Sequence, residues 1–381
     1  MPRTSVETIA LLREHRRGER RVLLGPDEVA VLSTMGVRVL VERGAGVASG
    51  HDDRSYSESG AQLVDRGEAW READVVMKYK APEPSEYRYF RPGLVLIAFL
   101  HVEGDMPLME SLESSGVTAW ALEMIEDDDG SFPGCVSDSE IAGTQAVLYG
   151  AWLLQSHLGG YGRLLSSVPG VPDPRVVVIG HGNAGGAAAR TAAALGARTT
   201  VIGRDPSRLR RFAATVGPRV ECMLNTPENL EEAVVDADLV VGAILISSHD
   251  TPAMLTPQLV GRMRPGSVIV DITCGYGAGY MPTAPRPTTF EEPAALAHGV
   301  LHVKIDAMPA SVPWTASRAT AANVFRFVRS MIAHYAHGEP LSRGLSAARV
   351  IADGRVLHPE LHRQRRLAIA TLEGSDRETP Q

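Results

Sequence analysis

A glycine-rich turn in the middle of the chain constrains the fold more than any other feature. Residues 180–185 read GHGNAG, directly after the apolar run RVVVI and before AAARTAAALGA, which is typical of a helix. In a G-x-G-x-x-G turn the first glycine permits the bend, the second lets the backbone approach a pyrophosphate, and the third allows helix and strand to pack closely. The helix N-terminus then faces the phosphates. This context predicts a dinucleotide site, rather than an ordinary tight turn, formed by Gly180, Gly182, Asn183, Ala184 and Gly185.

The rest of the chain repeats this alternation of strand and helix. After residue 170, helical segments separate the β-branched runs RTTVIG, DLVVGAILI and SVIVDITC. Nearly continuous apolar strands of this kind indicate a parallel, doubly wound α/β sheet. The N-terminal third shows the same pattern less regularly, with strands at VRVLVE, ADVVMKY, GLVLIAFLH and VTAWALE, so a second α/β domain is expected. We also expect a connecting helix at 140–158 and, after residue 317, an apolar helix followed by a polar tail.

Length and composition support two folded domains and exclude several classes of protein. The chain has 381 residues, of which 44% are hydrophobic and 22% charged, enough to bury full cores. A net charge of −7 gives no footprint for a nucleic acid, and three widely spaced cysteines predict neither a disulfide framework nor a metal site. The longest uncharged apolar run has eight residues, whereas a membrane helix needs about twenty. We expect a soluble, cytoplasmic protein without a membrane partner.

The end of the second strand of the dinucleotide motif bears on the choice of coenzyme. Folds that bind NAD usually place an acid there, where it hydrogen-bonds the ribose 2′-hydroxyl. This chain has Gly203 at that position, followed by Arg204, Ser207 and Arg208, which would attract a 2′-phosphate. NADP(H) is therefore favoured, and NAD(H) remains possible. The alternative is that Asp205 takes the role of the acid while the arginines form a solvated helix face.

Four ordered stretches carry a resemblance to a known family. They are Glu19-Arg20-Arg21-Val22 followed by Pro26, Ala73-Asp74 through Lys78-Tyr79-Lys80-Ala81-Pro82, Phe99-Leu100-His101, and Ser139-Glu140-Ile141-Ala142-Gly143 with Val168-Pro169-Gly170-Val171. In order and spacing they resemble the alanine dehydrogenase/transhydrogenase-domain superfamily, and its alanine dehydrogenase branch most closely, over about residues 10 to 350. The resemblance implies a homo-oligomer, often hexameric. It also implies a Rossmann domain at 135–313, inserted into a discontinuous catalytic domain made of 1–134 and 314–381.

The resemblance implies roles for three residues of the catalytic domain. Arg21 would bind the substrate carboxylate, which suits the fork of a guanidinium, although its arginine-rich surroundings also fit a solvated charge run. Lys80 would contact the carboxylate or oxo oxygen, with Lys78 as the competing candidate and a surface lysine as the alternative. His101, after the run LVLIAFL, would act as general acid and base, since histidine titrates near neutral pH. The alternative is that His101 caps a strand or lies in the core.

The chain departs from the alanine dehydrogenase pattern beside the expected coenzyme. Those enzymes carry a catalytic aspartate where this chain has Gly275, so Asp306 is the best candidate for a substitute carboxylate. An aspartate at position 306 resembles the opine-type branch of the superfamily. A glycine-rich loop here would leave room for a larger substrate beside the nicotinamide. The alternative is that the reaction with ammonia is lost or weak. The resemblance places Ser139 near the pyrophosphate, and Ile244 and Met308 against the nucleotide. Trp314 would line the substrate pocket or cap the domain junction.

Together these features predict an oxidoreductase that acts on the CH–NH bond of an amino acid or imine. Its substrate would be an amino acid and 2-oxo acid pair, with the amino acid other than or larger than alanine. The alternative within the class is an ordinary alanine dehydrogenase, which converts L-alanine to pyruvate and ammonia. From another class, the chain could be a catalytically silent dinucleotide-binding sensor.

Overall fold

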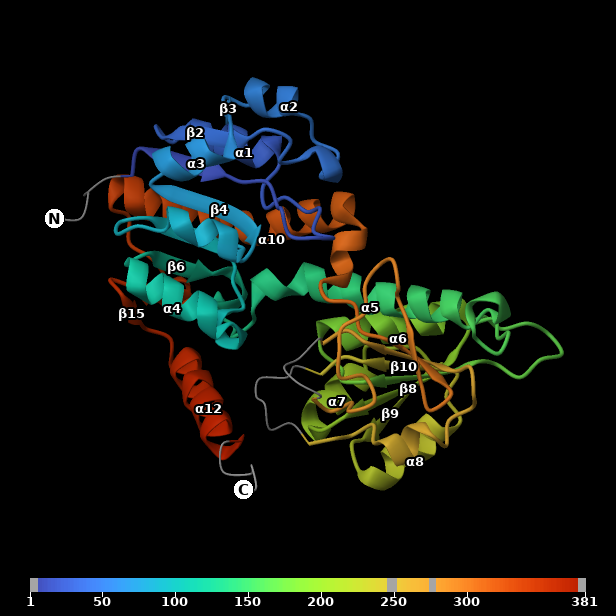
Figure 1. Cartoon of the computed structure of the whole chain (residues 1–381). Helices are drawn as coiled ribbons and strands as arrows, with labels where there is room; N and C mark the ends of the chain where they lie inside the picture. The colour runs from blue at the N-terminus through green and yellow to red at the C-terminus, as the bar shows by residue number, and fades with distance from the viewer. Residues whose placement is uncertain (1–5, 245–251, 274–278, 376–381) are drawn as a thin grey trace. The chain divides into compact units, whose positions relative to one another are not determined.

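A computed structural model describes residues 6–244, 252–273 and 279–375, and these residues form two compact units (Figure 1). Unit 1 comprises Met1–Ser137 and Ala310–Gln381, and unit 2 comprises Asp138–Pro309. The sequence places these borders at 134/135 and 313/314. Both units are α/β, as predicted. The first border falls within the long helix α5 (Pro133–Leu153), which begins earlier than residue 140.

Unit 1 is built on an eight-stranded sheet with the order β15-β14-β6-β5-β4-β1-β2-β3. Its strands are β1 (Thr8–Leu11), β2 (Arg38–Glu42), β3 (Gln62–Val64), β4 (Val75–Lys80), β5 (Val95–Phe99), β6 (Thr118–Ala121), β14 (Arg349–Ala352) and β15 (Arg355–Val356). Its helices are α1 (Pro26–Ser33), α2 (Asp53–Glu58), α3 (Arg66–Glu72), α4 (Met106–Ser115), α10 (Pro313–His337), α11 (Arg343–Ala347) and α12 (Pro359–Ser375). Strands β1 to β6 are parallel, whereas β14 and β15 run antiparallel at one edge.

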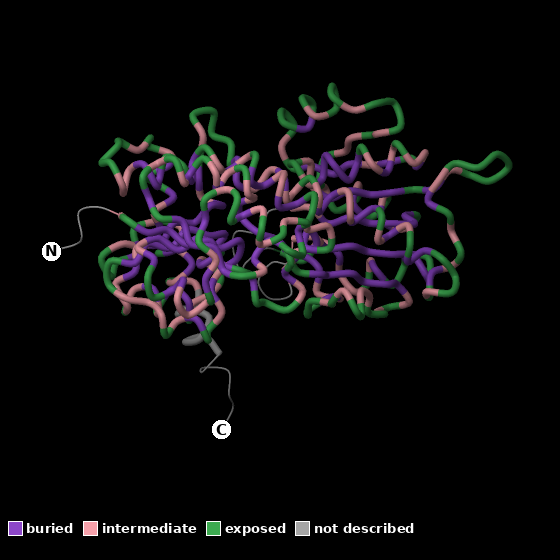
Figure 2. The backbone as a smooth tube through the Cα atoms, turned by 90° about the horizontal axis from the view of Figure 1, so that it is seen from above, coloured by how far each residue is buried: buried purple, intermediate pink, exposed green. Residues whose placement is uncertain are grey.

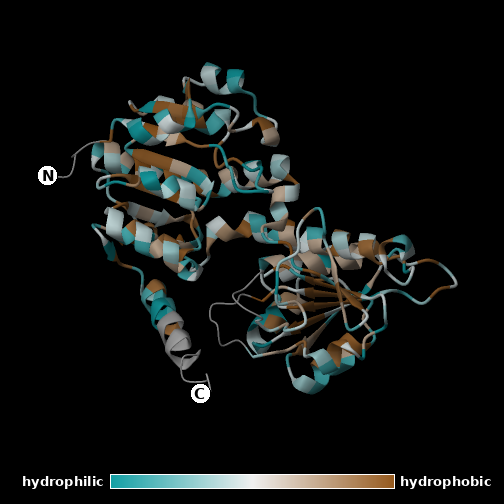
Figure 3. Cartoon of the chain, viewed as in Figure 1, coloured by the Kyte–Doolittle hydropathy of each residue, from teal (hydrophilic) through white to brown (hydrophobic). Residues whose placement is uncertain are grey.

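Alternating apolar side chains divide the core of unit 1 into two faces. In β1, Ile9 and Leu11 belong to a core that includes residues of α1 and α10, whereas Ala10, with Leu12 just after the strand, belongs to one that includes α3 and α4. The buried residues follow the strands (Figure 2), and the same strands are the most hydrophobic parts of the chain (Figure 3). Since both faces are covered, the strands read as continuous apolar runs.

The order of the strands in unit 1 creates a place where a ligand can bind. Strand β1 pairs with β2 on one side and with β4 on the other, so successive connections leave this point in opposite directions. In open parallel sheets the crevice for ligands lies at such a switch point, outside the carboxyl ends of the strands. The segments after β1, β4, β5 and β6 therefore hold the residues of interest.

Unit 2 has a seven-stranded sheet with the order β12-β13-β11-β10-β7-β8-β9. Its strands are β7 (Arg175–Ile179), β8 (Arg198–Gly203), β9 (Val220–Leu224), β10 (Leu239–Gly242), β11 (Val268–Asp271), β12 (Ala295–Ala297) and β13 (Val300–Val303), and only β12 is antiparallel among these described strands. Its helices are α6 (Asn183–Leu195), α7 (Pro206–Ala213), α8 (Pro227–Val235) and α9 (Pro257–Val260), together with most of α5. Its switch point lies between β7 and β10, beside the glycine-rich turn.

The structure corrects the prediction for the C-terminal part of the chain. The predicted apolar helix is present as α10, but the segment after it is not a polar tail: α11, β14, β15 and α12 continue the fold as far as Ser375. The two strands are short, and β14 completes the sheet by pairing with β6, a partner more than two hundred residues away in sequence. So short a strand gives almost no periodic signal. No helix in the described part of the chain is long and apolar enough to span a membrane.

Candidate active site and nucleotide-binding turn

Arg21 lies buried in the loop after β1, held by a carboxylate two residues before it. Glu19 accepts hydrogen bonds from Arg21 Nε at 2.8 Å and from Nη2 at 2.6 Å, a bidentate pair, and Arg21 is 2% exposed. Burial would raise the pKa of Glu19, but the hydrogen bonds and charge of Arg21 outweigh it, and the pKa lies below its usual value. The solvated charge run that the sequence allowed is therefore wrong for Arg21. The guanidinium is fixed in one orientation.

Tyr79 supports the same guanidinium through its ring. The Arg21 Cζ atom lies 4.1 Å from the centroid of the Tyr79 ring, a cation–π contact. The Tyr79 hydroxyl is 2.7 Å from Thr320 Oγ1, which ties the end of β4 to the long helix α10. Arg21 thus has a bidentate carboxylate partner and an aromatic ring on its face.

The two lysines of β4 have different environments. The Lys78 ammonium is fully buried and donates to Glu86 Oε2 at 2.7 Å, with Glu14 Oε2 at 3.5 Å. Lys80 is 9% exposed, and within the described residues its ammonium makes no hydrogen bond or ion pair, although its charge acts on Glu19. Lys78 is therefore engaged by buried carboxylates, which leaves Lys80 as the candidate lysine of the site.

Glu14 links both lysines to the end of β1. Its Oε1 atom accepts hydrogen bonds from the backbone nitrogens of Tyr79 at 2.8 Å and Lys80 at 3.2 Å. Burial raises the pKa of Glu14 to about 7, although Lys78 acts in the opposite direction. The pairing of β4 with β5 is irregular between Met77 and Lys80, so the ladder does not continue evenly over these residues.

His101 comes after β5 and takes a left-handed backbone conformation, with φ of 45°. Such a conformation is uncommon for a residue other than glycine, and it is held here by a buried carboxylate. Glu123, just after β6, accepts hydrogen bonds from Leu100 N at 3.1 Å and His101 N at 2.6 Å. The ring of His101 is 48% exposed, with Nδ1 3.8 Å from Glu103 Oε1. His101 is therefore not a core histidine.

Asp306 belongs to unit 2, whereas Trp314 belongs to unit 1. Asp306 is exposed, soon after β13 in unit 2, and the next residue, Ala307, has φ of 55°. Trp314, in the first turn of α10, is 60% exposed and packs within unit 1, where a β-carbon on Gly50 would lie 2.9 Å from its ring. The Arg318 guanidinium lies 4.2 Å from the ring.

The glycine-rich turn of unit 2 fits a dinucleotide at each of its three glycines. Gly180 has φ of 107°, and a β-carbon there would lie 2.3 Å from the Ala243 carbonyl oxygen. A β-carbon on Gly185 would lie 2.0 Å from the oxygen of Gly180, so strand and helix touch at that point. At Gly182, by contrast, no atom of the described chain lies within 4 Å of where a β-carbon would be. In G-x-G-x-x-G turns of known dinucleotide-binding folds, a pyrophosphate approaches the backbone through such an open space at the start of the helix.

The sequence motif Ser139–Gly143 packs against this same turn. A β-carbon on Gly143 of α5 would lie 2.0 Å from the carbonyl oxygen of Ala184, the second residue of α6. Ser139, four residues earlier on α5, is half-buried. The motif therefore brings the backbone of α5 against the first turn of α6.

At the end of β8, Gly203 carries no carboxylate. Asp205 Oδ1 accepts hydrogen bonds from the backbone nitrogens of Ser207 at 2.8 Å and Arg208 at 2.9 Å, and so caps α7. These backbone hydrogen bonds keep the pKa of Asp205 below its usual value. Arg204 and Arg208 are exposed.

Three further residues were predicted to lie near the coenzyme. Ile244 is half-buried after β10, and Met308 is 2% exposed and packs in the core of unit 2. Gly275 lies outside the described residues. Among the residues that the structure does describe, no group of three or more histidine, cysteine or acidic side chains could hold a metal ion.

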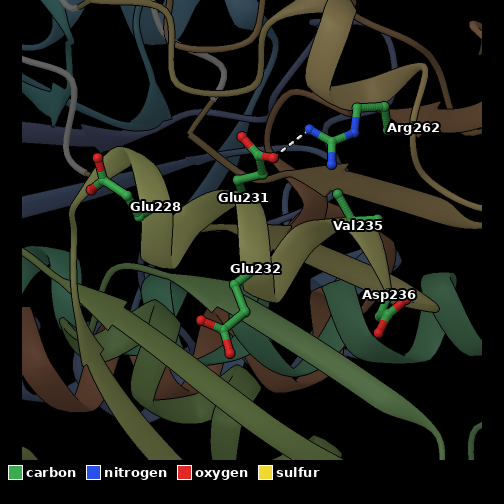
Figure 4. A pocket seen from close by; sticks show the side chains of 6 residues that line it. All are labelled: Glu228, Glu231, Glu232, Val235, Asp236 and Arg262. Atoms are coloured by element: carbon green, nitrogen blue, oxygen red, sulfur yellow. Dashed lines mark hydrogen bonds and ion pairs between the residues drawn. The ribbon is translucent and has the colours of Figure 1, made fainter.

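A hollow on the surface of unit 2 lies elsewhere. Figure 4 shows it lined by side chains from α8, by Asp236 at the end of that helix, and by Arg262, which pairs with Glu231. Its walls are mainly carboxylates: Glu228, Glu231, Glu232 and Asp236. An acidic surface would repel a phosphorylated coenzyme, and none of the residues of the glycine-rich turn lines it.

The sequence alone missed the residues that support the site. Glu19 stands in the recognised stretch with Arg21, yet nothing in the spacing says that the two side chains pair. Glu14, Tyr79 and Glu123 end strands or come soon after them, and these strands become neighbours only in the sheet. The one signal available was position, because all three stand at carboxyl ends of apolar runs.

A guanidinium, an ammonium and an imidazole follow or end three neighbouring strands of one sheet, β1, β4 and β5, and the other unit carries a glycine-rich turn after a strand. These are the groups that an NAD(P)-dependent oxidoreductase needs. Residues 10–142 match the model of the alanine dehydrogenase/PNT N-terminal domain, and residues 146–359 match that of its C-terminal domain. The chain belongs to the alanine dehydrogenase/PNT family.

Individual relatives agree with this assignment. The chain is 39% identical over 310 residues to the alanine dehydrogenase of Bacillus subtilis (strain 168), which covers 81% of each protein. A solved L-alanine dehydrogenase, 33% identical, superposes with a TM-score of 0.87 over 94% of this chain and 99% of that one. A transhydrogenase from Sinorhizobium meliloti, 25% identical, gives 0.78 over 93% and 99%. The protein is therefore an enzyme, a nicotinamide-dinucleotide-dependent dehydrogenase of the amino acid dehydrogenase kind, and not a silent sensor.

Proposed function

We propose that the enzyme interconverts an amino acid with a 2-oxo acid and an amine, with NADP(H) as its coenzyme. The presence of Arg21, Lys80 and His101 after or at the end of the neighbouring strands β1, β4 and β5 carries this proposal. A guanidinium suits a carboxylate, an ammonium suits a carbonyl oxygen, and an imidazole can move a proton at neutral pH. The coenzyme, when bound, supplies or accepts the hydride.

The side chains divide the work according to their surroundings. Arg21 holds the substrate carboxylate, and because it is buried the pair is shielded from water, which strengthens it. Glu19 and Tyr79 keep the guanidinium in place, so little side-chain entropy is lost on binding. Lys80 polarises the oxo or imine group, and His101 holds or gives the proton at the substrate nitrogen or at water.

Positions in unit 2 are proposed to hold the coenzyme. Gly180, Gly182, Asn183, Ala184 and Gly185 would cradle the pyrophosphate with backbone groups, and Ser139 would lie beside them. Ile244 and Met308 would pack against the nucleotide. Gly203 offers no acid to repel a 2′-phosphate, Arg204 and Arg208 offer positive charge, and the neighbouring acid, Asp205, is engaged as a helix cap.

The identity of the amino acid rests on the sequence beside the coenzyme. The family's alanine dehydrogenases carry a catalytic aspartate where this chain has Gly275, and Asp306 is the proposed replacement. We propose a substrate other than or larger than alanine, with Trp314 at its binding region. The second candidate is ordinary alanine dehydrogenase activity, and it is favoured by the 39% identity to a relative of that name.

Initial rates distinguish these candidates. Pyruvate and bulkier 2-oxo acids are offered with ammonia or with an amino acid as amine donor, each with NADPH and with NADH. Consumption of NADPH with a bulkier acid or an amine donor is the expected result. Efficient turnover of pyruvate with ammonia makes the enzyme an alanine dehydrogenase, and a preference for NADH overturns the assignment of the coenzyme.

A further inference from the structure

The turn that binds the pyrophosphate contains a histidine with an unusual position. A β-carbon built on Gly203 would lie 2.5 Å from His181 Nδ1 and 2.8 Å from Cε1. Real β-carbons do not approach other atoms so closely, so the imidazole occupies the space that a side chain at residue 203 would fill. His181 is the second residue of the glycine-rich turn, and Gly203 is the last residue of the neighbouring strand β8.

This space has a defined function in dinucleotide-binding folds. The side chain at the end of the second strand is the one that meets the ribose 2′ position of the adenosine. Here no such side chain exists, and the ring of His181 stands in its place. We infer that His181 contacts the 2′-phosphate of NADP(H) and, together with Arg204 and Arg208, selects this coenzyme. The inference rests on the proposed coenzyme and assigns its recognition to a particular residue.

The surroundings of the ring are suited to this role. Phe212 of α7 packs against it, with ring centroids 5.9 Å apart and planes tilted by 52°, which limits its movement. The charged groups that act on it are Asp205 and Arg208 at the start of α7. The ring is partly exposed, so a phosphate can reach it from solvent.

The charge of the ring should depend on the ligand. Burial keeps the pKa of His181 below its usual value, with Asp205 opposing and Arg208 adding to that effect. A phosphate dianion beside the ring would favour its charged form, so binding would draw a proton onto the imidazole. Affinity for the 2′-phosphate should then fall as pH rises through the pKa of the ring in the complex. A ribose hydroxyl would draw no proton.

Calorimetric titration of the full chain with 2′,5′-ADP and with 5′-AMP measures the contribution of the 2′-phosphate directly, without catalysis. We expect His181→Ala to lower affinity for 2′,5′-ADP about tenfold or more, the size of a charge-assisted hydrogen bond, and to leave 5′-AMP nearly unchanged. It should also abolish the proton uptake seen when the titration is repeated in buffers of different ionisation enthalpy. His157→Ala, at an exposed histidine of unit 2, is the control and should leave both affinities unchanged.

A double substitution tests the geometry. Gly203→Asp alone should weaken both ligands, because its β-carbon collides with the ring of His181 and with Leu209, 2.9 Å away. Adding His181→Ala removes the two shortest contacts, and the remaining one is to Leu209 Cδ1, the end of a flexible side chain that can move, so the double variant should bind 5′-AMP and NADH better than either single variant does. Simple additivity of the two effects would overturn the inference.

The outcomes separate this inference from the proposal on which it rests. If the unmodified protein binds 2′,5′-ADP more tightly than 5′-AMP and His181→Ala preserves that preference, His181 does not recognise the 2′-phosphate, and the coenzyme assignment stands. If the unmodified protein prefers 5′-AMP and NADH, both are wrong.

Discussion

Lys78 and Lys80 are two residues apart on the same strand, yet only one of them is available for chemistry. Lys78 lies between Glu14 and Glu86, and its removal would take a cation from both buried carboxylates, of which Glu86 would keep its ion pair with Arg66. Lys80 has no such partner among the described residues. The sequence pointed to Lys80 and kept Lys78 as a competitor, because only the folded structure shows which ammonium the carboxylates surround.

Substituting each lysine by methionine should separate the two roles. Lys78→Met should lower the free energy of unfolding by about 3–5 kcal/mol, the cost of breaking a buried pair. Lys80→Met should leave stability nearly unchanged and reduce kcat/KM at least about a hundredfold, since it removes a charged contact to substrate. Thermal unfolding and initial rates on both variants measure this. A stable, inactive Lys78→Met would reverse the assignment.

Glu123 should position His101 without itself touching substrate. Glu123→Gln replaces one carboxylate oxygen by an amide donor, so either Leu100 N or His101 N loses its acceptor. We expect kcat to fall about tenfold, with KM for the 2-oxo acid much less affected and the pH profile of kcat displaced. His101→Ala, which removes the imidazole itself, should be inactive at every pH. An unchanged pH profile in Glu123→Gln would leave Glu123 with a purely structural role.

Glu14 gives the stability of the protein a dependence on pH with a definite sign. Burial raises its pKa from 4.5 to about 7, so the folded protein holds a proton that the unfolded chain has released across this range. The stability that this proton provides is complete below pH 4.5 and is lost as pH rises through about 7. Glu14→Gln cannot ionise. Denaturant unfolding should show it gaining at most about 3 kcal/mol relative to the unmodified protein between pH 5 and pH 8, and a constant difference would contradict this.

At the scale of elements, α5 packs directly against the first turn of α6, where the glycine-rich turn ends. Gly143 allows the backbone of α5 to approach Ala184 closely enough that no other residue fits. The sequence supplied the motif around Gly143 but not the reason for it, since helix packing is a property of two elements together. The same holds for β14, whose pairing with β6 depends on a distant segment.

Gly143→Ala should therefore damage the nucleotide site from a distance. Overpacking costs about 1–3 kcal/mol, and here it pushes against the first turn of α6, so coenzyme affinity should fall along with stability. Gly217→Ala is the matched control, because no described atom lies within 4 Å of its added β-carbon. Thermal shift with and without NADPH compares the two. Equal behaviour of both variants would mean that α5 and α6 can separate without cost.

At the scale of the whole molecule, the sequence predicted the α/β class of both units and the position of the glycine-rich turn. Long apolar runs and glycine spacing are local signals, so they can be recognised in the sequence alone. The roles of Glu14 and Glu123 could not be predicted, because their partners come together only when the strands take their order in the sheet. Glu19 pairs with Arg21 only two residues away, but spacing alone does not show that the two side chains meet. The homo-oligomer implied by the resemblance stays a prediction, and exposed Leu148 and Trp152 on α5 are apolar positions where a second copy could pack.

The most direct test follows a deuterium atom. NADPH labelled at the transferring position of the nicotinamide is supplied with the 2-oxo acids and amines of the rate measurements, and the products are analysed by mass spectrometry. We predict one deuterium at the α-carbon of an amino acid other than alanine. Labelled alanine as the main product would contradict the proposed substrate, and product without deuterium would contradict hydride transfer to the α-carbon altogether.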